Sequence, residues 1–492
     1  MTQPPSDSER YAYIDGNKFG FYIPSLISTL TILVGLIHFS LSRPSLWWYL
    51  IYALLLGFYL FLSFTVGLFS RPFDFNAFKL ASGGIQKPSI DVFLPSCGED
   101  LNTIKNTINH AVLMADHYGP ARVYVLDDAG NTDLSIWCIE HKIPYIHRKD
   151  RVLRKAGNIR NAFPITKGEW ILILDADFVA RHDMLSEMVR HIDDKSAIIQ
   201  TPQYFRVSKG MPWIEKGAGF VQELFYRLIQ VNRNHFGASI CVGTCALYRR
   251  KALEPFGGTA PIDYSEDLHT GFMIMQGGWT IKYFPVNLAA GECPNTLESF
   301  FSQQYRWCMG SITLMTNKDF WLARRVSLVQ KLCFITGMLY YVTTAAGILL
   351  TTIPAIIVLY FYPEMANWHS AVFSIPSLLV GTIVIALWSN LPFGLYAIEA
   401  RIISYWAHLF AITDKARGNL MPWIPTGAVR GGTRYSLFKW LFSIYTVALV
   451  LLVVGGVYSN YENKEIYPMV SMTLFYRCLD LKIVKSLWMN EA

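Results

Sequence analysis

The chain has 492 residues, of which 52% are hydrophobic, 15% aromatic and 16% charged, and its formal net charge is +7. It is too apolar for an ordinary soluble enzyme, and its well-charged middle excludes a pure bundle of membrane helices. The Lys and Arg excess is explained by the cytoplasmic loops of a membrane protein, and no basic stripe with interleaved aromatic residues indicates nucleic acid as a partner.

Two apolar segments open the chain. Residues 23–41 and 46–69 contain no Asp, Glu, Lys or Arg. Each is long enough to cross about 30 Å of hydrocarbon, and only four residues join them. We therefore expect 23–69 to form a transmembrane hairpin behind a cytoplasmic N-terminal leader, residues 1–22. The leader carries acidic residues and precedes a long span, which is not typical of a cleaved signal peptide.

A soluble domain follows the hairpin, and we place it at residues 70–327. Within it, short apolar runs alternate with charged segments that permit helices, which is the pattern of a parallel α/β sheet with ligands gathered where the strands end. The expected strands are DVFLP (91–95), VYVLDD (123–128), WILILDAD (170–177) and SAIIQTPQYF (196–205).

Three further apolar segments follow, at 342–361, 371–388 and 440–457, and charges interrupt a sixth candidate span near 467–487. A basic, turn-rich segment between the fourth and fifth spans is expected on the cytoplasmic face. The expected organisation is an interface helix with two transmembrane helices at 328–400, a cytoplasmic interface helix with a gating-loop-like segment at 401–439, and a C-terminal transmembrane helix or hairpin with its tail at 440–492.

The eight cysteines show no paired metal-ligand spacing, and six of them fall in the predicted cytoplasmic domain, where thiols stay reduced. Cys241 and Cys245 could hold zinc in principle. No second Cys pair or His couple accompanies them, so we expect both to be packing residues.

Acidic and basic residues follow the predicted strands. In LILDADF (172–178), Asp175 and Asp177 point the same way at the end of a buried run, and two such carboxylates repel unless a cation or N–H donors neutralise them. A solvated pair at a strand end is the alternative. Asp127 and Asp128 likewise end a strand. RKAGNIRNA places Arg154, Lys155 and Arg160 near the start of a helix, whose N–H groups attract anions.

Two motifs complete the pattern: YSEDLHTGF supplies Glu266 and Asp267, and QQYRW supplies Gln303, Arg306 and Trp307. In this order, and between membrane spans, the motifs resemble those of processive family 2 glycosyltransferases, the group of cellulose, curdlan, chitin and hyaluronan synthases. The resemblance covers roughly residues 20–460. It implies an α/β GT-A domain with a mixed, mostly parallel sheet inserted between transmembrane helices, a UDP-sugar donor, and a growing polysaccharide acceptor that threads through a channel in the membrane.

The resemblance assigns donor-binding roles to the first group of residues. Asp177, with Asp175, would hold Mg²⁺ or Mn²⁺, which suit oxygen ligands and neutralise the charge that develops on the diphosphate. Asp127, Asp128, Lys155 and Asp175 would contact the donor nucleotide. For Lys155, a solvated cation at a helix start is the alternative.

Asp267 is the expected catalytic base, because an alcohol is a poor nucleophile while it keeps its proton. It matches the last residue of the family's Thr-Glu-Asp motif, with Ser265 in place of Thr. Glu266 is equally explained by the dipole of a helix start. A single base without a second, nucleophilic carboxylate implies one displacement and therefore inversion, from an α-linked donor to a β-linked product.

Gln303, Arg306 and Trp307 are expected to bind the acceptor or the diphosphate, with Trp307 as a stacking surface for a sugar ring. The alternative is a core Trp beside a structural Arg. In MPWIPTGA (421–428), Trp423 and Thr426 match parts of the gating loop of cellulose synthases, but Ala428 stands where that loop carries Lys. This difference leaves the product less certain than the reaction.

The sequence thus predicts a multi-pass protein of the plasma (inner) membrane, with a cytoplasmic catalytic domain, that uses a UDP-sugar. We expect UDP-glucose, elongation of a β-glucan and its translocation across the membrane for a capsule, matrix or wall. The alternatives are a chitin- or hyaluronan-type synthase that uses UDP-N-acetylglucosamine, a non-processive transferase acting on a lipid phosphate, and a catalytically inactive transport subunit. The sequence identifies no accessory protein.

Overall fold

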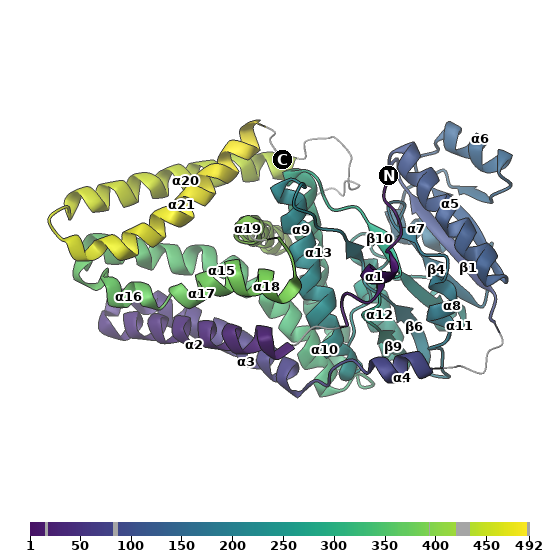
Figure 1. Cartoon of the computed structure of the whole chain (residues 1–492), viewed down its shortest axis with the longest axis horizontal. Coiled ribbons are helices and arrows are strands. Elements are labelled where there is room, and N and C mark those ends of the chain that lie inside the picture. The colour runs from purple at the N-terminus through teal and green to yellow at the C-terminus, as the bar shows by residue number, and fades with distance from the viewer. Residues whose placement is uncertain (15–17, 82–86, 393, 420–432, 490–492) are drawn as a thin grey trace.

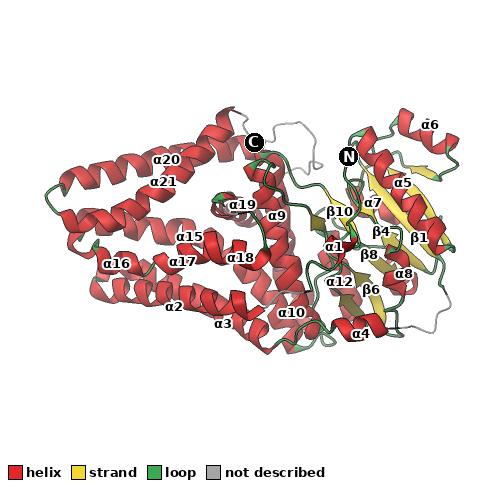
Figure 2. Cartoon of the chain, in the orientation of Figure 1, coloured by secondary structure: helices red, strands yellow, loops and turns green. Residues whose placement is uncertain are grey.

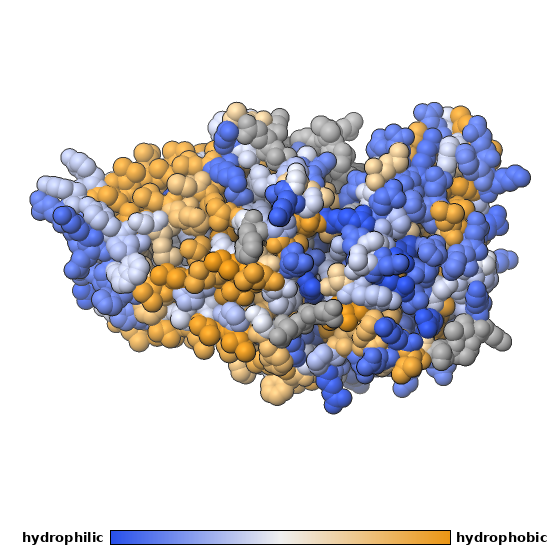
Figure 3. All heavy atoms as spheres, viewed as in Figure 1, coloured by the Kyte–Doolittle hydropathy of each residue, from blue (hydrophilic) through white to orange (hydrophobic). Residues whose placement is uncertain are grey.

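The computed structural model describes residues 1–14, 18–81, 87–392, 394–419 and 433–489. The chain divides into an α/β half and an all-helical half (Figure 1, Figure 2). On the face shown in Figure 3, hydrophobic residues cover much of the helical half and hydrophilic residues dominate the α/β half. This contrast matches a membrane-inserted part joined to a water-exposed part.

A seven-stranded sheet forms the centre of the α/β half, in the order β3-β2-β1-β4-β8-β6-β9. β8 is antiparallel to both of its neighbours, and the other neighbouring strands are parallel. The expected mixed, mostly parallel sheet is therefore present. Its strands are β1 (Ile90–Ser96), β2 (Ala121–Asp127), β3 (Tyr145–His147), β4 (Trp170–Ile173), β6 (Ser196–Gln200), β8 (Ala246–Arg249) and β9 (Thr280–Tyr283).

Both faces of this large sheet are buried, as the alternation along β1 shows. Val92 and Leu94 pack into one apolar core with Ile108 of α5 (Leu101–Tyr118), whereas Phe93 packs into a second core with Phe272 of α12 (Glu266–Gln276). Successive strand residues point to opposite faces, so each face receives its own layer of helices.

A second, small sheet has the order β5-β10-β7 and lies beside the end of β4. Asp175 follows β4 of the large sheet, and Asp177 comes just before β5 of the small one. The two carboxylates of the Asp-x-Asp motif therefore stand on the junction of the two sheets. The strands of the small sheet are β5 (Val179–Ala180), β7 (Tyr204–Phe205) and β10 (Ala289–Gly291).

Short and medium helices complete the α/β half, and several are capped by side chains. Asp100 accepts bonds from two N–H groups of α5, and Asn131 caps α6 in the same way, which stabilises both helix starts. The remaining helices here are α1 (Asp7–Arg10), α4 (Phe75–Leu80), α6 (Thr132–Glu140), α7 (Arg154–Ala162), α8 (Met184–Val189), α10 (Gln230–His235), α11 (Arg250–Leu253) and α14 (Lys318–Leu322).

Three helices lie where the two halves meet: α9 (Trp213–Leu224), α13 (Leu297–Thr316) and α19 (Tyr396–Arg417). In Figure 1, α19 is seen nearly end-on and runs across the direction of the long helices. α13 and α19 share a buried aromatic core that includes Phe301 and Phe410. This core joins the α/β half to the helical half through apolar packing.

Among the described residues, five helices are long and apolar enough to cross a membrane: Lys18–Ser42, Pro44–Phe69, Leu328–Phe361, Trp368–Ser389 and Arg434–Ser459. The chain is therefore a multi-pass membrane protein. The charge-interrupted segment near 467–487 forms a further helix beside α20, outside those five. The labelled helices of this half are α2 (Lys18–Ser42), α3 (Trp47–Phe69), α15 (Leu328–Phe361), α16 (Trp368–Val372), α17 (Ile375–Leu379), α18 (Ile385–Ser389), α20 (Thr433–Ser459) and α21 (Tyr467–Met489).

Candidate active site

Lys155 links the acid at the end of β4 to the loop before β8. Its Nζ donates to Asp175 Oδ1 (2.5 Å) and to the carbonyl oxygen of Gly243 (3.0 Å). The backbone N–H of Asp175 donates to Thr244 Oγ1 (2.9 Å). Burial alone would lower the pKa of Lys155, but the Asp175 and Glu266 carboxylates outweigh burial and raise it. Lys155 therefore stays charged and neutralises Asp175.

Asp267 lies on the other side of the same loop. Gly243 has φ of +74°, and a Cβ at this residue would stand 2.8 Å from Asp267 Oδ2. The Leu268 N–H donates to Asp267 Oδ1 (2.8 Å). Burial, and then the Glu266 carboxylate, raise the pKa of Asp267 above its ordinary value, and Lys155 opposes this shift. Contacts through Lys155 and Gly243 thus bring Asp175 and Asp267 to one site.

Asp177 lies near two other acidic side chains, Asp175 and Glu99. Burial, followed by the Asp175 and Glu99 carboxylates, raises the pKa of Asp177 to about 8. Glu99 follows β1 and accepts a bond from the Cys97 N–H (2.7 Å). The sequence analysis missed Glu99, although its position at the carboxyl end of a predicted strand was a usable signal.

This donor set suits a divalent cation. Carboxylate oxygens are the ligands that Mg²⁺ and Mn²⁺ prefer, and a cation would relieve the repulsion among Asp175, Asp177 and Glu99. No group of three or more His, Cys, Asp or Glu side chains in the described part of the chain is arranged to hold a metal by itself.

The carboxylates of Asp127 and Asp128 are buried and held by the chain itself. Asp127 accepts from two backbone N–H groups of the loop after β2 and from the Tyr145 hydroxyl, each at 2.7 Å. Asp128 forms a two-point ion pair with Arg148, at 2.6 and 2.8 Å. Both acids shape the loop at the carboxyl end of β2, and their contact with a nucleotide stays a prediction.

Gln303, Arg306 and Trp307 lie on one face of α13, because residues three and four apart on a helix are neighbours. All three are partly exposed, while the opposite face of α13 is buried. The Ser265 hydroxyl donates to the Arg306 carbonyl oxygen (3.3 Å), which places this face of α13 against the start of α12.

Positive charge gathers between α7 and α13. Burial lowers the pKa of Arg306 to about 10; Tyr264 opposes the shift, and Arg154 adds to it. The Arg154 guanidinium lies 5.9 Å from the centre of the Tyr264 ring. Two guanidinium groups near Lys155 are suited to a ligand with several negative oxygens, such as a diphosphate. The sequence analysis noted Arg154 beside a helix start but did not include it in the site.

The predictions for the gating loop and for the two cysteines have separate outcomes. Trp423 and Thr426, expected in a gating loop, fall in 420–432, outside the described residues. Cys241 and Cys245 are buried free thiols, and Cys241 Sγ lies 3.0 Å from the Tyr248 hydroxyl. Their surroundings agree with the packing role expected for them.

The curated relatives of this chain include cellulose synthase catalytic subunits. The chain is 30% identical over 259 residues to the UDP-forming cellulose synthase catalytic subunit of Xanthomonas axonopodis pv. citri, covering 52% of this chain and 36% of that protein. It is also 30% identical over 261 residues to the cellulose synthase 1 catalytic subunit of Komagataeibacter xylinus, covering 51% of this chain and 34% of that protein. The chain thus spans about a third of the length of these relatives.

A solved structure and a family model extend the comparison. A mannosyltransferase from Pyrobaculum calidifontis, in complex with GDP-Man and Mn²⁺, aligns with a TM-score of 0.54 at 16% identity, over 78% of this chain and 99% of that one. At this identity the alignment shows the fold alone, which is the GT-A fold. The model described as "Glycosyl transferase family group 2" matches residues 170–479, more than half of the chain. The chain therefore belongs to glycosyl transferase family group 2.

Proposed function

We propose that this protein is an inverting, processive glycosyltransferase that elongates a β-linked polysaccharide from a UDP-sugar at the membrane and translocates the product. UDP-glucose is the proposed donor and a β-glucan the proposed product. The cellulose synthase relatives support this choice of sugar, and the candidate membrane helices support translocation.

The observation that carries the proposal is the set of contacts from Asp175 through Lys155 and Gly243 to Asp267. An inverting transfer needs a donor held by its diphosphate and a base on the far side of the reacting carbon. The chain brings a neutralised acid, a cation and a half-buried carboxylate with a raised pKa to one loop. Such an arrangement supports both parts of the reaction.

The donor side would bind the diphosphate through positive charge. Lys155, Arg154 and Arg306 would take its oxygens, and Asp177 with Asp175 would hold Mg²⁺ or Mn²⁺ beside it. The metal, when bound, would supply charge neutralisation for the leaving UDP. If Asp175 bound the metal, Lys155 would lose Asp175 as its partner. Lys155 would then be free to turn toward the phosphates.

The acceptor side would use Asp267 and α13. Burial keeps the pKa of Asp267 high, so the carboxylate can take a proton from a sugar hydroxyl as the hydroxyl attacks. Trp307 would stack against the terminal sugar ring, and Gln303 would hydrogen-bond its hydroxyl groups. We place the catalytic half on the cytoplasmic side of the plasma (inner) membrane, where UDP-sugars are made.

The test is a synthesis assay with the full chain purified in detergent. UDP-glucose, UDP-N-acetylglucosamine and GDP-mannose would be supplied separately, each with Mg²⁺ or Mn²⁺, and polymers digested with linkage-specific hydrolases. We expect polymer from UDP-glucose alone, digestible by a β-glucanase and with β-linkages by NMR. An α-linked product, or a lipid carrying a single sugar, would contradict the proposal.

A further inference from the structure

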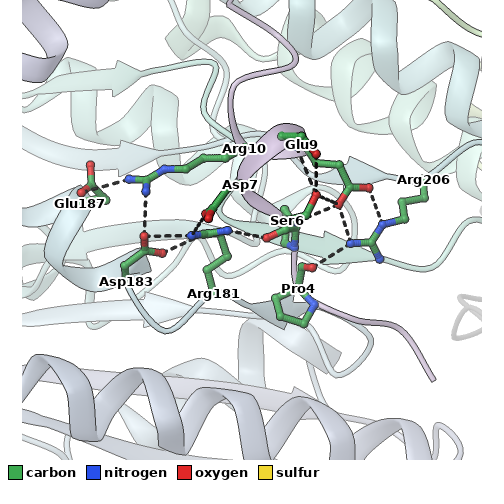
Figure 4. A network of polar contacts seen from close by, with 11 residues as sticks. Pro4, Ser6, Asp7, Glu9, Arg10, Arg181, Asp183, Glu187 and Arg206 are labelled. Carbon is green, nitrogen blue, oxygen red and sulfur yellow. Dashed lines mark hydrogen bonds and ion pairs between the residues drawn. The ribbon is translucent and has the colours of Figure 1, made fainter.

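Residues 2–13 form an N-terminal strap that crosses the small sheet (Figure 4). The strap contains α1, which Ser6 and Glu9 close with reciprocal bonds to backbone N–H groups. The Tyr13 side chain is buried, and the Ala12 carbonyl oxygen accepts from Arg227 Nη2 (2.6 Å). The strap is therefore an ordered part of the catalytic half.

Arg181, directly after β5, makes the first attachment of the strap. Its Nη1 donates to the Pro5 carbonyl oxygen (2.6 Å) and its Nη2 to Asp7 Oδ1 (2.8 Å). Its Nε donates to Asp183 (2.9 Å), and Asp183 also pairs with Arg10 of the strap (2.9 Å). The end of β5 is thus held from two sides by charged contacts, as Figure 4 shows.

The strap also fastens β7. Arg206, directly after this strand, binds Glu9 through two of its nitrogens, at 2.6 and 3.0 Å. The same guanidinium donates to the carbonyl oxygens of Gln3 and Pro4, each at 2.8 Å. Arg206 therefore ties the end of β7 to both the backbone and a carboxylate of the strap.

The strap holds β10 on both sides of the strand. Before β10, the Asn287 side chain donates to the Glu9 carbonyl oxygen and its backbone N–H donates to the Arg10 carbonyl oxygen, each at 2.9 Å. After β10, Glu292 accepts from the Thr2 hydroxyl (2.9 Å). One segment thus contacts the ends of all three strands of the small sheet.

The small sheet carries the proposed metal ligand. Asp177 lies two residues before β5, and the intervening Phe178 packs against Gly291 of β10, where an added Cβ would stand 2.4 Å from the Phe178 ring. The strands have only two or three residues each, so few ladder hydrogen bonds fix them. Charged contacts from the strap act together with the apolar packing of Ala180, Phe205 and Ala289 to hold this sheet in place.

We propose that the N-terminal strap sets the position of Asp177 for a metal-bound nucleotide diphosphate, with Arg181 and Arg206 as positioning residues that never touch the ligand. This inference rests on the proposed function. Residues that orient a metal ligand from behind affect metal affinity even though they are not ligands. The strap would therefore act on donor binding, and the acceptor side of the site would be independent of it.

The test measures Mn²⁺ binding in the presence of UDP, by electron paramagnetic resonance on the purified full chain. Arg181→Met and Arg206→Met are expected to weaken Mn²⁺ binding by about 10-fold each. Arg181→Lys keeps a positive charge and should recover part of the loss. Arg122→Met, which removes an exposed Arg on the large sheet, is the matched control and should bind Mn²⁺ as the wild type does.

The outcomes separate the inference from the proposed function. If Asp177→Asn loses Mn²⁺ binding while both Arg variants bind like the wild type, the role of the strap is wrong and the donor site stands. If Asp177→Asn itself binds Mn²⁺ normally, the proposed metal site is wrong. Should Arg181→Met fail to fold, Asp7→Asn and Glu9→Gln remove the same contacts from the strap side, and normal Mn²⁺ binding in both would overturn the inference.

Discussion

The two sheets of the catalytic half differ in strand length and in their charged contacts. Helices cover both faces of the large sheet, whereas the small sheet has very short strands that pack on the same apolar core and are tied at their ends to the strap by charged contacts. Asp175 belongs to the first and Asp177 to the second. The comparison teaches that two acids only two residues apart can be supported separately: Asp175 pairs with Lys155, whereas Asp177 precedes a strand that Arg181 ties to the strap.

The largest expected effect is at the site that the large sheet supports. Under the proposed function, Asp267→Asn should lower polymer synthesis by about 100- to 10,000-fold, because the variant would lack the proposed base for the acceptor hydroxyl. UDP and Mn²⁺ binding should remain close to wild type, as calorimetry and paramagnetic resonance would measure. Asp133→Asn, an exposed acid on α6, is the matched control. Synthesis that survives in Asp267→Asn would remove this residue from catalysis.

The second-largest expected effect concerns an ion pair of β1 in the large sheet. Arg250 pairs with Asp91 of β1 (2.7 Å) and donates to the carbonyl oxygens of Phe163 and Gly168; Asp91 is buried and Arg250 is mostly shielded from solvent. Arg250→Met leaves the Asp91 carboxylate without its charged partner and should lower the free energy of unfolding by about 3–5 kcal/mol. Denaturant unfolding of the full chain would measure the loss. If Arg250→Met lowers the free energy of unfolding no more than Arg206→Met does, the contrast between the two sheets is wrong.

Gly291→Ala tests the packing between the small sheet and Asp177. The new methyl group would overlap the ring of Phe178, and overpacking of this kind costs about 1–3 kcal/mol. We expect weaker Mn²⁺-dependent UDP binding, because Phe178 moves together with the neighbouring acid. Gly210→Ala, where no atom lies within 4 Å of the added Cβ, is the control. Equal UDP binding in the two variants would show that the position of Phe178 does not affect the site.

The smallest expected effect is the pH dependence of the strap. The hydrogen bond from Arg206 lowers the pKa of Glu9 from 4.5 to about 2. A carboxylate with a lowered pKa stabilises the fold above pH 4.5, and this contribution is lost as the pH falls toward 2. Glu9→Gln should therefore cost about 1 kcal/mol at pH 7 and less at pH 3, measured by denaturant unfolding. A cost that does not change with pH would contradict the ion pair.

Much of the large sheet can be predicted from the sequence, and the small sheet cannot. The runs at 91–95 and 123–128 overlap β1 and β2, and the run at 170–177 contains β4, because buried strands are continuous apolar runs. The single run at 196–205 forms two strands in different sheets, β6 and β7, on either side of Pro202, which has no N–H to donate. Strands of two or three residues are too short to show an alternation.

The candidate site was predictable where a motif carries it. Asp175, Lys155 and Asp267 were named from local patterns, and the structure brings them together. Their roles, like those of the α13 residues, remain proposals. The contacts of the strap gave no local signal, because they join residues such as Arg10 and Asp183, which are 173 positions apart. Such pairs become visible only when tertiary packing is known.

The tight crossing of α12 and α13 has a mechanical consequence. Gly310 of α13 faces Ser265 so closely that a Cβ there would stand 2.1 Å from the Ser265 hydroxyl oxygen. The helix that would bind the polymer end is therefore locked to Ser265, two residues before the proposed base Asp267, and its far side packs among the long hydrophobic helices. Under the proposed function, each added sugar would require the polymer to move along α13. The helix itself and the rest of the protein would keep their positions.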